Sequence, residues 1–246
     1  MLPNPGNDRA AVVTGASSGI GACIARELAR RGHQVVLVAR RADKLADLAG
    51  QLGARTHVVP ADLARRDERA ALADRLSELG LFTNVLVNNA GLSTVGPVAQ
   101  SDVDAELNLV EVDVAAVVDL CSRLVPAMVE ARSGAVLNVG SVGSFGPLPG
   151  QASYAAAKAF VLSYTRALRE ELRGSGVTAA ALCPGPVHTG FGEAAGFGEG
   201  EAEALLPKFL WVSPERVAAV AVDGLAAGRA VIVPGVFNRA ATAIYH

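Results

Sequence analysis

Short valine-rich runs alternate with helix-forming segments along the sequence, and this alternation limits the possible folds more than any other feature. Seven apolar runs are too short for helices and are interpreted as strands, at residues 10–13, 35–39, 57–59, 85–87, 135–139, 177–182 and 230–233. Between them, apolar residues recur with helical spacing, as in Ile20, Ile24 and Leu28. Strands that alternate with helices form right-handed βαβ units, so the sequence predicts an α/β protein with a doubly wound parallel sheet.

Composition and charge narrow the function classes. Hydrophobic residues make up 51% of the 246 residues, which suits buried parallel strands covered by helices. The formal net charge of -2 does not indicate a basic surface for nucleic acid. The sequence contains no run of about 18 apolar residues, so no membrane span is predicted. The three cysteines form no metal-ligand pattern, and the N-terminus lacks the apolar core of a signal peptide. We therefore expect one cytoplasmic domain, residues 1–246, without a metal.

A glycine-rich turn, TGASSGIG at residues 14–21, connects the first predicted strand to the first predicted helix. Gly15 permits a tight turn, Gly19 allows the backbone to approach a pyrophosphate, and Gly21 allows the helix to pack close to the sheet. Backbone N–H groups and the helix dipole then face the phosphates of a dinucleotide. The alternative is a glycine-rich turn that binds nothing, which the strand before and the helix after disfavour.

The second predicted strand ends without the carboxylate that would hold the ribose 2′-hydroxyl of NAD, and two arginines follow it. Ala39 ends the strand, and Arg40 and Arg41 come next. Arginine suits a 2′-phosphate, which a carboxylate repels. We therefore predict selection for NADP, with Arg40 as the favoured phosphate ligand and a hydroxyl of Ser17 or Ser18 assisting. Two arginines that only solvate a loop are the alternative.

Three residues that suit carbonyl chemistry follow the fifth predicted strand. Ser141 lies at its C-terminal end, the side on which open α/β sheets bind ligands, and Tyr154 and Lys158 share one face of a helix. Reduction of a carbonyl group requires a proton at oxygen. Tyr154 suits this role because the ammonium of Lys158 favours the phenolate that remains. Ser141 suits a hydrogen bond to the carbonyl oxygen. Alone, a tyrosine and a lysine at this spacing would indicate ordinary helix packing.

Together these motifs resemble the short-chain dehydrogenase/reductase family over nearly the whole chain. The resemblance rests on TGASSGIG, on VNNAG at 87–91, on Ser141 with YAAAK at 154–158, and on CPGPVHT at 183–189. It implies a single Rossmann-fold domain with a seven-stranded parallel sheet, a cofactor half at about 8–140 and a catalytic and substrate-loop half at about 141–240. It also implies a homodimer or homotetramer, in which helices near 102–131 and 152–173 pair between subunits.

The resemblance assigns roles to individual residues. It implies that Ser141, Tyr154 and Lys158 are catalytic, that Asp62 meets the adenine amino group, and that the segment after the sixth strand holds the nicotinamide carboxamide. The predicted cofactor-binding residues are Gly15, Ser17, Ser18, Gly19, Ile20, Gly21, Arg40, Arg41, Asp62, Leu63, Asn89, Ala90, Gly91, Tyr154, Lys158, Pro184, Gly185, Val187 and Thr189. The predicted substrate-binding residues are Ser93, Val142, Leu148, Phe191 and Trp211.

One position departs from the family pattern. Asp113, in EVDVAAVV at 111–118, stands where the family commonly has an asparagine whose main-chain carbonyl holds a water near the lysine. A carbonyl survives the change to aspartate, so Asp113 is included among the catalytic candidates. Its side chain would alter the helix bend or add a negative charge near Lys158.

A glycine-rich segment separates the sixth strand from a helix that starts at Ser213, with Pro214 at its first position. It contains a short acidic helical piece near Glu199–Leu206. A long loop at such a place is often an active-site lid, here expected at about 186–212.

The sequence therefore predicts an NADPH-dependent oxidoreductase that reduces a ketone or an aldehyde to an alcohol. A 3-oxoacyl, steroid-like or other apolar carbonyl compound is the expected substrate, because the predicted pocket residues are mostly apolar. Two alternatives stay open: a non-catalytic NADP-binding or redox-sensing protein on the same fold, and an NAD-dependent alcohol dehydrogenase.

Overall fold

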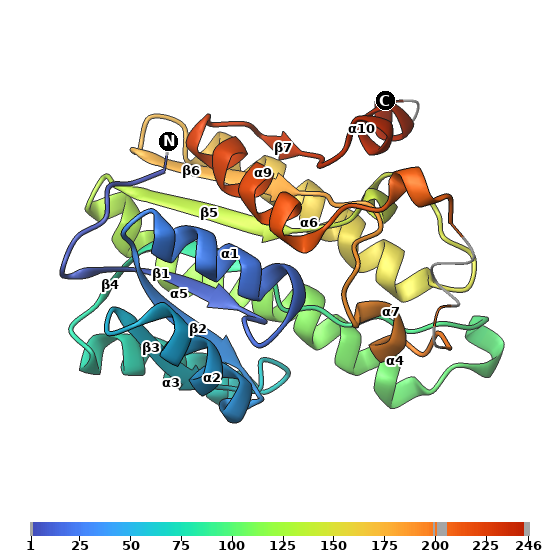
Figure 1. Cartoon of the computed structure of the whole chain (residues 1–246), viewed down its shortest axis with the longest axis horizontal. Coiled ribbons are helices and arrows are strands. Elements are labelled where there is room, and N and C mark those ends of the chain that lie inside the picture. The colour runs from blue at the N-terminus through green and yellow to red at the C-terminus, as the bar shows by residue number, and fades with distance from the viewer. Residues whose placement is uncertain (1, 199, 201–205, 244–246) are drawn as a thin grey trace.

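A single sheet of seven parallel strands forms the centre of the structure, a computed structural model that describes residues 2–198, 200 and 206–243 (Figure 1). The strands are β1 (Arg9–Thr14), β2 (Gln34–Ala39), β3 (Thr56–Pro60), β4 (Phe82–Asn88), β5 (Gly134–Val139), β6 (Val177–Leu182) and β7 (Val231–Ile232). Their order across the sheet is β3-β2-β1-β4-β5-β6-β7, and all neighbouring pairs are parallel. The predicted doubly wound Rossmann sheet is confirmed, and each predicted run overlaps a strand.

Helices cover both faces of the sheet. They are α1 (Gly19–Arg30), α2 (Ala42–Leu52), α3 (Arg66–Glu78), α4 (Val103–Val110), α5 (Ala116–Glu130), α6 (Ala152–Glu171), α7 (Phe191–Ala194), α9 (Pro214–Ala226) and α10 (Val236–Ala243). Short 3-10 turns are η1 (Val98–Gln100), η3 (Val142–Phe145) and η4 (Lys208–Leu210). The acidic helical piece predicted near Glu199–Leu206 falls largely outside the described residues. In the part of the chain that the structure describes, no helix combines the length and hydropathy that a bilayer crossing requires.

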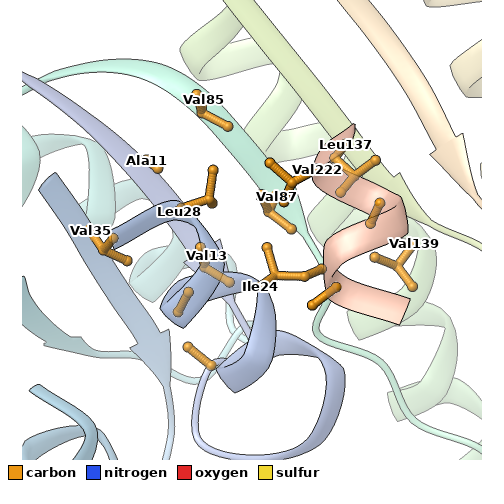
Figure 2. Packing of buried hydrophobic residues seen from close by; sticks show 14 of the residues in the cluster. Ala11, Val13, Ile24, Leu28, Val35, Val85, Val87, Leu137, Val139 and Val222 are labelled. Atoms are coloured by element: carbon orange, nitrogen blue, oxygen red, sulfur yellow. The ribbon is translucent and has the colours of Figure 1, made fainter. Parts of the chain in front are cut away.

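Two hydrophobic cores lie on opposite faces of the sheet. On one face α1 supplies Ile24 and Leu28 and α9 supplies Val222, which pack over the strands as Figure 2 shows, and α2 contributes to the same core. On the other face the core is closed by α3, α5 and α6. Successive strand residues point to opposite faces, so Val12 and Val13 belong to different cores. Burial of each large aliphatic side chain stabilises the fold by about 1.5–3 kcal/mol.

The parallel arrangement brings the C-terminal ends of the strands to one edge, on the right in Figure 1, where α4 and α7 lie. A buried polar chain ties α6 to this edge. Asn88 of β4 donates to Asn138 of β5 at 2.8 Å, and Asn138 donates to Thr165 of α6 at 2.9 Å. Because buried amides are costly without partners, these bonds fix the position of α6 against the sheet.

The helix expected over 102–131 is interrupted. Between α4 and α5 the backbone forms a π-helical turn, η2 (Glu111–Ala115), in which one extra residue is accommodated. The turn buries Asp113, whose exposed fraction is 1%. The aspartate predicted to alter the bend of this helix therefore lies within an irregular turn, of a kind that is frequent at functional sites.

The two ends of the segment 186–212 are held together. Val187 and Val212 form an isolated parallel β-bridge, and the Val212 N–H donates to the Pro186 carbonyl at 3.0 Å. The helix α9 then starts as predicted, because Ser213 Oγ accepts the Arg216 N–H at 3.2 Å and Pro214 is the first helical residue.

Candidate active site

The glycine-rich turn packs tightly against the end of β4. Gly15 and Gly19 have φ of 64° and 55°, in the left-handed region that favours glycine. A Cβ at Gly21 would lie 2.4 Å from Asn89 Nδ2, so only glycine fits between the turn and β4. A Cβ at Gly19 would lie 3.1 Å from Thr189 Cγ2, which shows that the segment after β6 reaches over the turn.

The N-terminus of α1 is arranged to receive an anion. Ser18 is the N-cap residue, but its side chain makes no capping hydrogen bond, so the first N–H groups of α1 keep their capacity to bind a ligand. Arg41 Nη2 donates to Ser17 Oγ at 2.9 Å and to Ser18 Oγ at 2.8 Å. A guanidinium group therefore stands beside the turn and complements negative charge there.

Arg40, which the sequence favoured as the phosphate ligand, takes a different position. It lines a shallow hollow with Pro60, Ala61, Asp62 and Glu68. The structure thus brings Arg41, rather than Arg40, to both serines of the turn.

The predicted adenine side is a short loop after β3. Asp62 Oδ1 accepts the Ala64 N–H at 3.1 Å, and the Asp62 N–H donates to Glu68 Oε2 at 2.6 Å. The side chain of Leu63 is buried in the core, and its carbonyl accepts from Arg69 Nη1 at 2.7 Å. Of the two residues, only Asp62 carries its side chain at the partly exposed rim of the hollow.

Thr14, at the end of β1, supports the glycine-rich turn, and the sequence analysis missed it. Its Oγ1 accepts the N–H groups of Asn89 at 2.9 Å and Ala90 at 3.0 Å. Asn89 Nδ2 returns a bond to the Thr14 carbonyl at 2.9 Å. These bonds hold the end of β4 against the glycine-rich turn. The signal was present, because threonine is the first residue of TGASSGIG.

Ser141 is fixed by a reciprocal pair of bonds at the end of β5. Its Oγ accepts the Gly143 N–H at 3.0 Å, while its own N–H donates to Ser144 Oγ at 3.1 Å. An acceptor role leaves the hydroxyl hydrogen of Ser141 for donation to another group. The Val142 N–H donates to the Pro184 carbonyl at 2.9 Å, which joins this turn to the segment after β6.

Tyr154 and Lys158 project from the same face of α6. The Lys158 Nζ lies 5.7 Å from the centroid of the Tyr154 ring. It also donates to the Val139 carbonyl at 3.2 Å and pairs with Asp113 Oδ2 at 2.9 Å. Burial disfavours the Lys158 ammonium, but Asp113 and Tyr154 outweigh this effect and raise the pKa of Lys158 above its usual value.

Asp113 is almost completely buried beside this lysine. Its Oδ1 accepts the Leu92 N–H at 2.7 Å. Burial raises the pKa of Asp113, and the ammonium of Lys158 and the Leu92 N–H oppose that shift. Gly91 leaves room for the pair, because a Cβ there would lie 3.1 Å from Lys158 Nζ and 3.2 Å from Asp113 Oδ2.

Asn238 of α10 is a second residue that the sequence analysis missed. It fits against Gly185, where a Cβ would lie 2.5 Å from its side-chain amide. Its Nδ2 donates to the carbonyl groups of Leu210 at 3.0 Å and Pro234 at 3.1 Å. Asn238 thereby connects the predicted nicotinamide segment at Gly185 to the turn at Leu210 and to the residues that follow β7. No motif marks a lone asparagine near the C-terminus, so only the fold reveals it.

The predicted substrate residues take several different positions. The Phe191 ring lies 6.1 Å from the Tyr154 ring, and Gln151 Nε2 donates to Ser93 Oγ at 2.8 Å. Trp211 instead stacks on His188, with ring centroids 4.7 Å apart. Leu148 packs against Gly143, two residues after Ser141. The structure therefore places Phe191 beside the tyrosine and Leu148 beside the serine turn, and it pairs Trp211 with His188.

Comparison with known proteins finds matches that cover most of the chain. A family model described as short chain dehydrogenase matches residues 9–198. Sulfoacetaldehyde reductase 2 of Chromohalobacter salexigens is 37% identical over 185 residues, which cover 73% of this chain and 73% of that protein. A short-chain dehydrogenase from Sphingobium yanoikuyae in complex with NADPH has a TM-score of 0.84 at 33% identity, covering 93% of this chain and 88% of that one. A Burkholderia phymatum short chain dehydrogenase/reductase in complex with NAD has a TM-score of 0.87 at 26% identity, covering 99% and 94%.

Proposed function

The chain belongs to the short-chain dehydrogenase family, and on that premise we propose that it is an NADPH-dependent reductase that converts a ketone or an aldehyde to an alcohol. The observation that carries the proposal is the buried ammonium of Lys158, 5.7 Å from the ring of Tyr154. A relative named for aldehyde reduction, sulfoacetaldehyde reductase 2, supports the reductive direction.

The glycine-rich turn, the N-terminus of α1 and Arg41 fit a nicotinamide dinucleotide. The glycine-rich turn has the close backbone approach that a pyrophosphate requires, and α1 begins without a capping side chain. Arg41 with Ser17 and Ser18 supplies a guanidinium and two hydroxyls for a 2′-phosphate, which favours NADP over NAD. When bound, the reduced cofactor supplies the hydride to the carbonyl carbon.

Each catalytic residue then has one task. Ser141 donates a hydrogen bond to the carbonyl oxygen and holds it beside Tyr154. Tyr154 gives its phenolic proton to that oxygen as negative charge develops there. Lys158, fixed by the Val139 carbonyl, stabilises the phenolate that results, and it would also hold the ribose hydroxyls beside the nicotinamide.

The substrate proposed is an apolar carbonyl compound, either a 3-oxoacyl, a steroid-like or another hydrophobic ketone or aldehyde. Phe191 beside Tyr154 and Leu148 beside the Ser141 turn supply apolar surface on the substrate side. The residues Ser93, Val142 and Trp211 complete the proposed lining, and none of the five carries a charge.

A cofactor-dependent turnover screen tests the proposal. Purified protein is mixed with NADPH and a panel of 3-oxoacyl thioesters, cyclic ketones and aldehydes, and the loss of NADPH absorbance is followed. We expect turnover with at least one class and a lower rate with NADH. Tight NADPH binding without turnover of any carbonyl would instead support a redox-sensing protein, and preferential oxidation of alcohols with NAD would support an alcohol dehydrogenase.

A further inference from the structure

The lysine beside Tyr154 is not an isolated positive charge. Asp113 Oδ2 lies 2.9 Å from Lys158 Nζ, and the exposed fractions of the two side chains are 5% for the lysine and 0% for the aspartate. At this separation and burial, solvent screens the pair little. The carboxylate therefore offsets much of the field that the ammonium would exert on the phenol.

The groups around Lys158 come from several elements. Tyr154 lies on the same helix, Asp113 faces it from the π-helical turn, and Cys183 approaches from the end of β6. Burial raises the pKa of Cys183 to about 12, so its thiol stays neutral at working pH. The Val139 carbonyl of β5 adds a neutral acceptor. Of these groups, Asp113 is the carboxyl group that faces the lysine, with Oδ2 2.9 Å from Nζ.

The backbone holds the carboxylate in this place. Asp113 Oδ1 accepts the Leu92 N–H at 2.7 Å, which fixes the side chain at the end of β4. The π-helical turn carries Asp113 inward, while Glu111 of the same turn reaches Arg69 Nη1 at 3.2 Å. The two acidic residues of this turn thus pair with different residues, Glu111 with Arg69 and Asp113 with Lys158.

We propose that Asp113 is a positioning residue: by pairing with Lys158 it offsets the positive field of the ammonium at Tyr154, and it thereby keeps the Tyr154 phenol protonated into the alkaline range. The proposal rests on the proposed reductase function, because in a reductase the phenol must be protonated before each turnover. Beside an ammonium without a paired carboxylate, the Tyr154 phenol would lose its proton more readily. That state suits alcohol oxidation, in which the phenolate is the base.

The direct test is an absorbance titration of tyrosinate without cofactor or substrate. The chain has three tyrosines, and the difference between each variant and its Tyr154→Phe counterpart isolates the signal of Tyr154. We expect Asp113→Asn to move this titration to lower pH by about one unit, since a nearby charge shifts a titration by about one to three units. Asp113→Glu keeps the charge and should restore most of the wild-type profile.

Glu111→Gln is the matched control, because it removes the same charge from the same turn but from a side chain that pairs with Arg69. It should leave the titration unchanged. A folded Asp113→Asn protein whose Tyr154 titrates as in the wild type would overturn the proposal. If that variant does not fold, Asp113→Ser removes the same charge in a smaller side chain and is judged by the same criterion.

The pH dependence of reduction provides the second readout. In Asp113→Asn the alkaline limb of kcat/KM for a carbonyl substrate should move to lower pH by the same amount as the titration. If the titration of Tyr154 shifts but the alkaline limb of kcat/KM does not, the proposed link between this phenol and the reduction rate is contradicted. If no carbonyl is turned over at all, the reductase assignment fails, while the titration still decides whether Asp113 controls the phenol.

Discussion

The guanidinium of Arg41 is the side chain that we propose distinguishes NADPH from NADH. It reaches two hydroxyls of the glycine-rich turn, at 2.9 and 2.8 Å, beside the N-terminus of α1. Charge-assisted hydrogen bonds of this kind contribute about 1.5–3 kcal/mol each. A 2′-phosphate would gain these contacts and a 2′-hydroxyl would not, so Arg41 should discriminate NADPH from NADH.

We therefore expect Arg41→Ala to weaken NADPH binding about 10- to 100-fold and to change NADH binding little. Fluorescence titration of both cofactors measures the two dissociation constants. Arg40→Ala is the comparison, and we expect a smaller loss because Arg40 lines the hollow near Asp62. A larger loss for Arg40→Ala would indicate that Arg40, the residue that the sequence favoured, binds the 2′-phosphate. An unchanged NADPH preference in both variants would contradict the claim that these arginines select NADP.

At the scale of elements, α1 and α9 are joined by charge as well as by apolar packing. Glu27 accepts from Arg30 at 2.8 Å and from Arg31 at 2.6 Å, and Arg31 also pairs with Asp223 of α9 at 2.6 Å. The bonds from Arg30 and Arg31 lower the pKa of Glu27 from 4.5 to about 2. Because the folded pKa is depressed, the stabilisation is present above pH 4.5 and is lost as the pH falls toward 2.

Glu27→Gln should lower the free energy of unfolding at pH 7 by about 1–2 kcal/mol, a figure reduced for solvent screening. The difference from the wild type should shrink to less than half at pH 3. Urea denaturation at both pH values measures it. Glu170→Gln, on the exposed Arg173–Glu170 pair of α6, is the control and should change stability little. A loss for Glu27→Gln that is equal at both pH values would argue against the ion pairs as its cause.

Elements were predictable from the sequence where the signal is local. Valine-rich runs gave the strands, and the Ser213–Pro214 pair gave the start of α9, because capping and side-chain alternation act over a few residues. The π-helical turn at Glu111–Ala115 was not predicted, since one extra residue barely disturbs apolar periodicity. The pairing of Asp113 with Lys158 joins residues 45 positions apart and needed the fold to be seen.

At the scale of the whole molecule, two neighbouring helices, α4 and α6, each expose apolar side chains. Val103 and Leu107 of α4 are 66% and 60% exposed, and Phe160 of α6 is 39% exposed and stacks on Tyr164. The two helices contact one another, so these side chains lie on neighbouring elements. Exposed apolar side chains gathered on packed helices indicate an interface. We propose that the 1–246 chain acts as one domain and assembles through this surface into a homodimer or homotetramer.

Light scattering after size exclusion should therefore give a multiple of the 25.1 kDa chain mass. The double variant Leu107→Asp and Phe160→Asp should shift the protein toward the single-chain mass, because it buries charge in the contact. Leu79→Asp, at an exposed position at the end of α3, is the control and should leave the assembly intact. A wild-type protein at the single-chain mass would contradict the proposed assembly.

The central claim is that Tyr154 donates the proton during carbonyl reduction, and the Tyr154→Phe variant tests it most directly. Its kcat is measured with the best carbonyl substrate at saturating NADPH, together with its dissociation constant for NADPH. The account predicts a loss in kcat of about 100- to 10,000-fold with cofactor binding retained. A Tyr154→Phe protein that binds NADPH and reduces the carbonyl at the wild-type rate would contradict it.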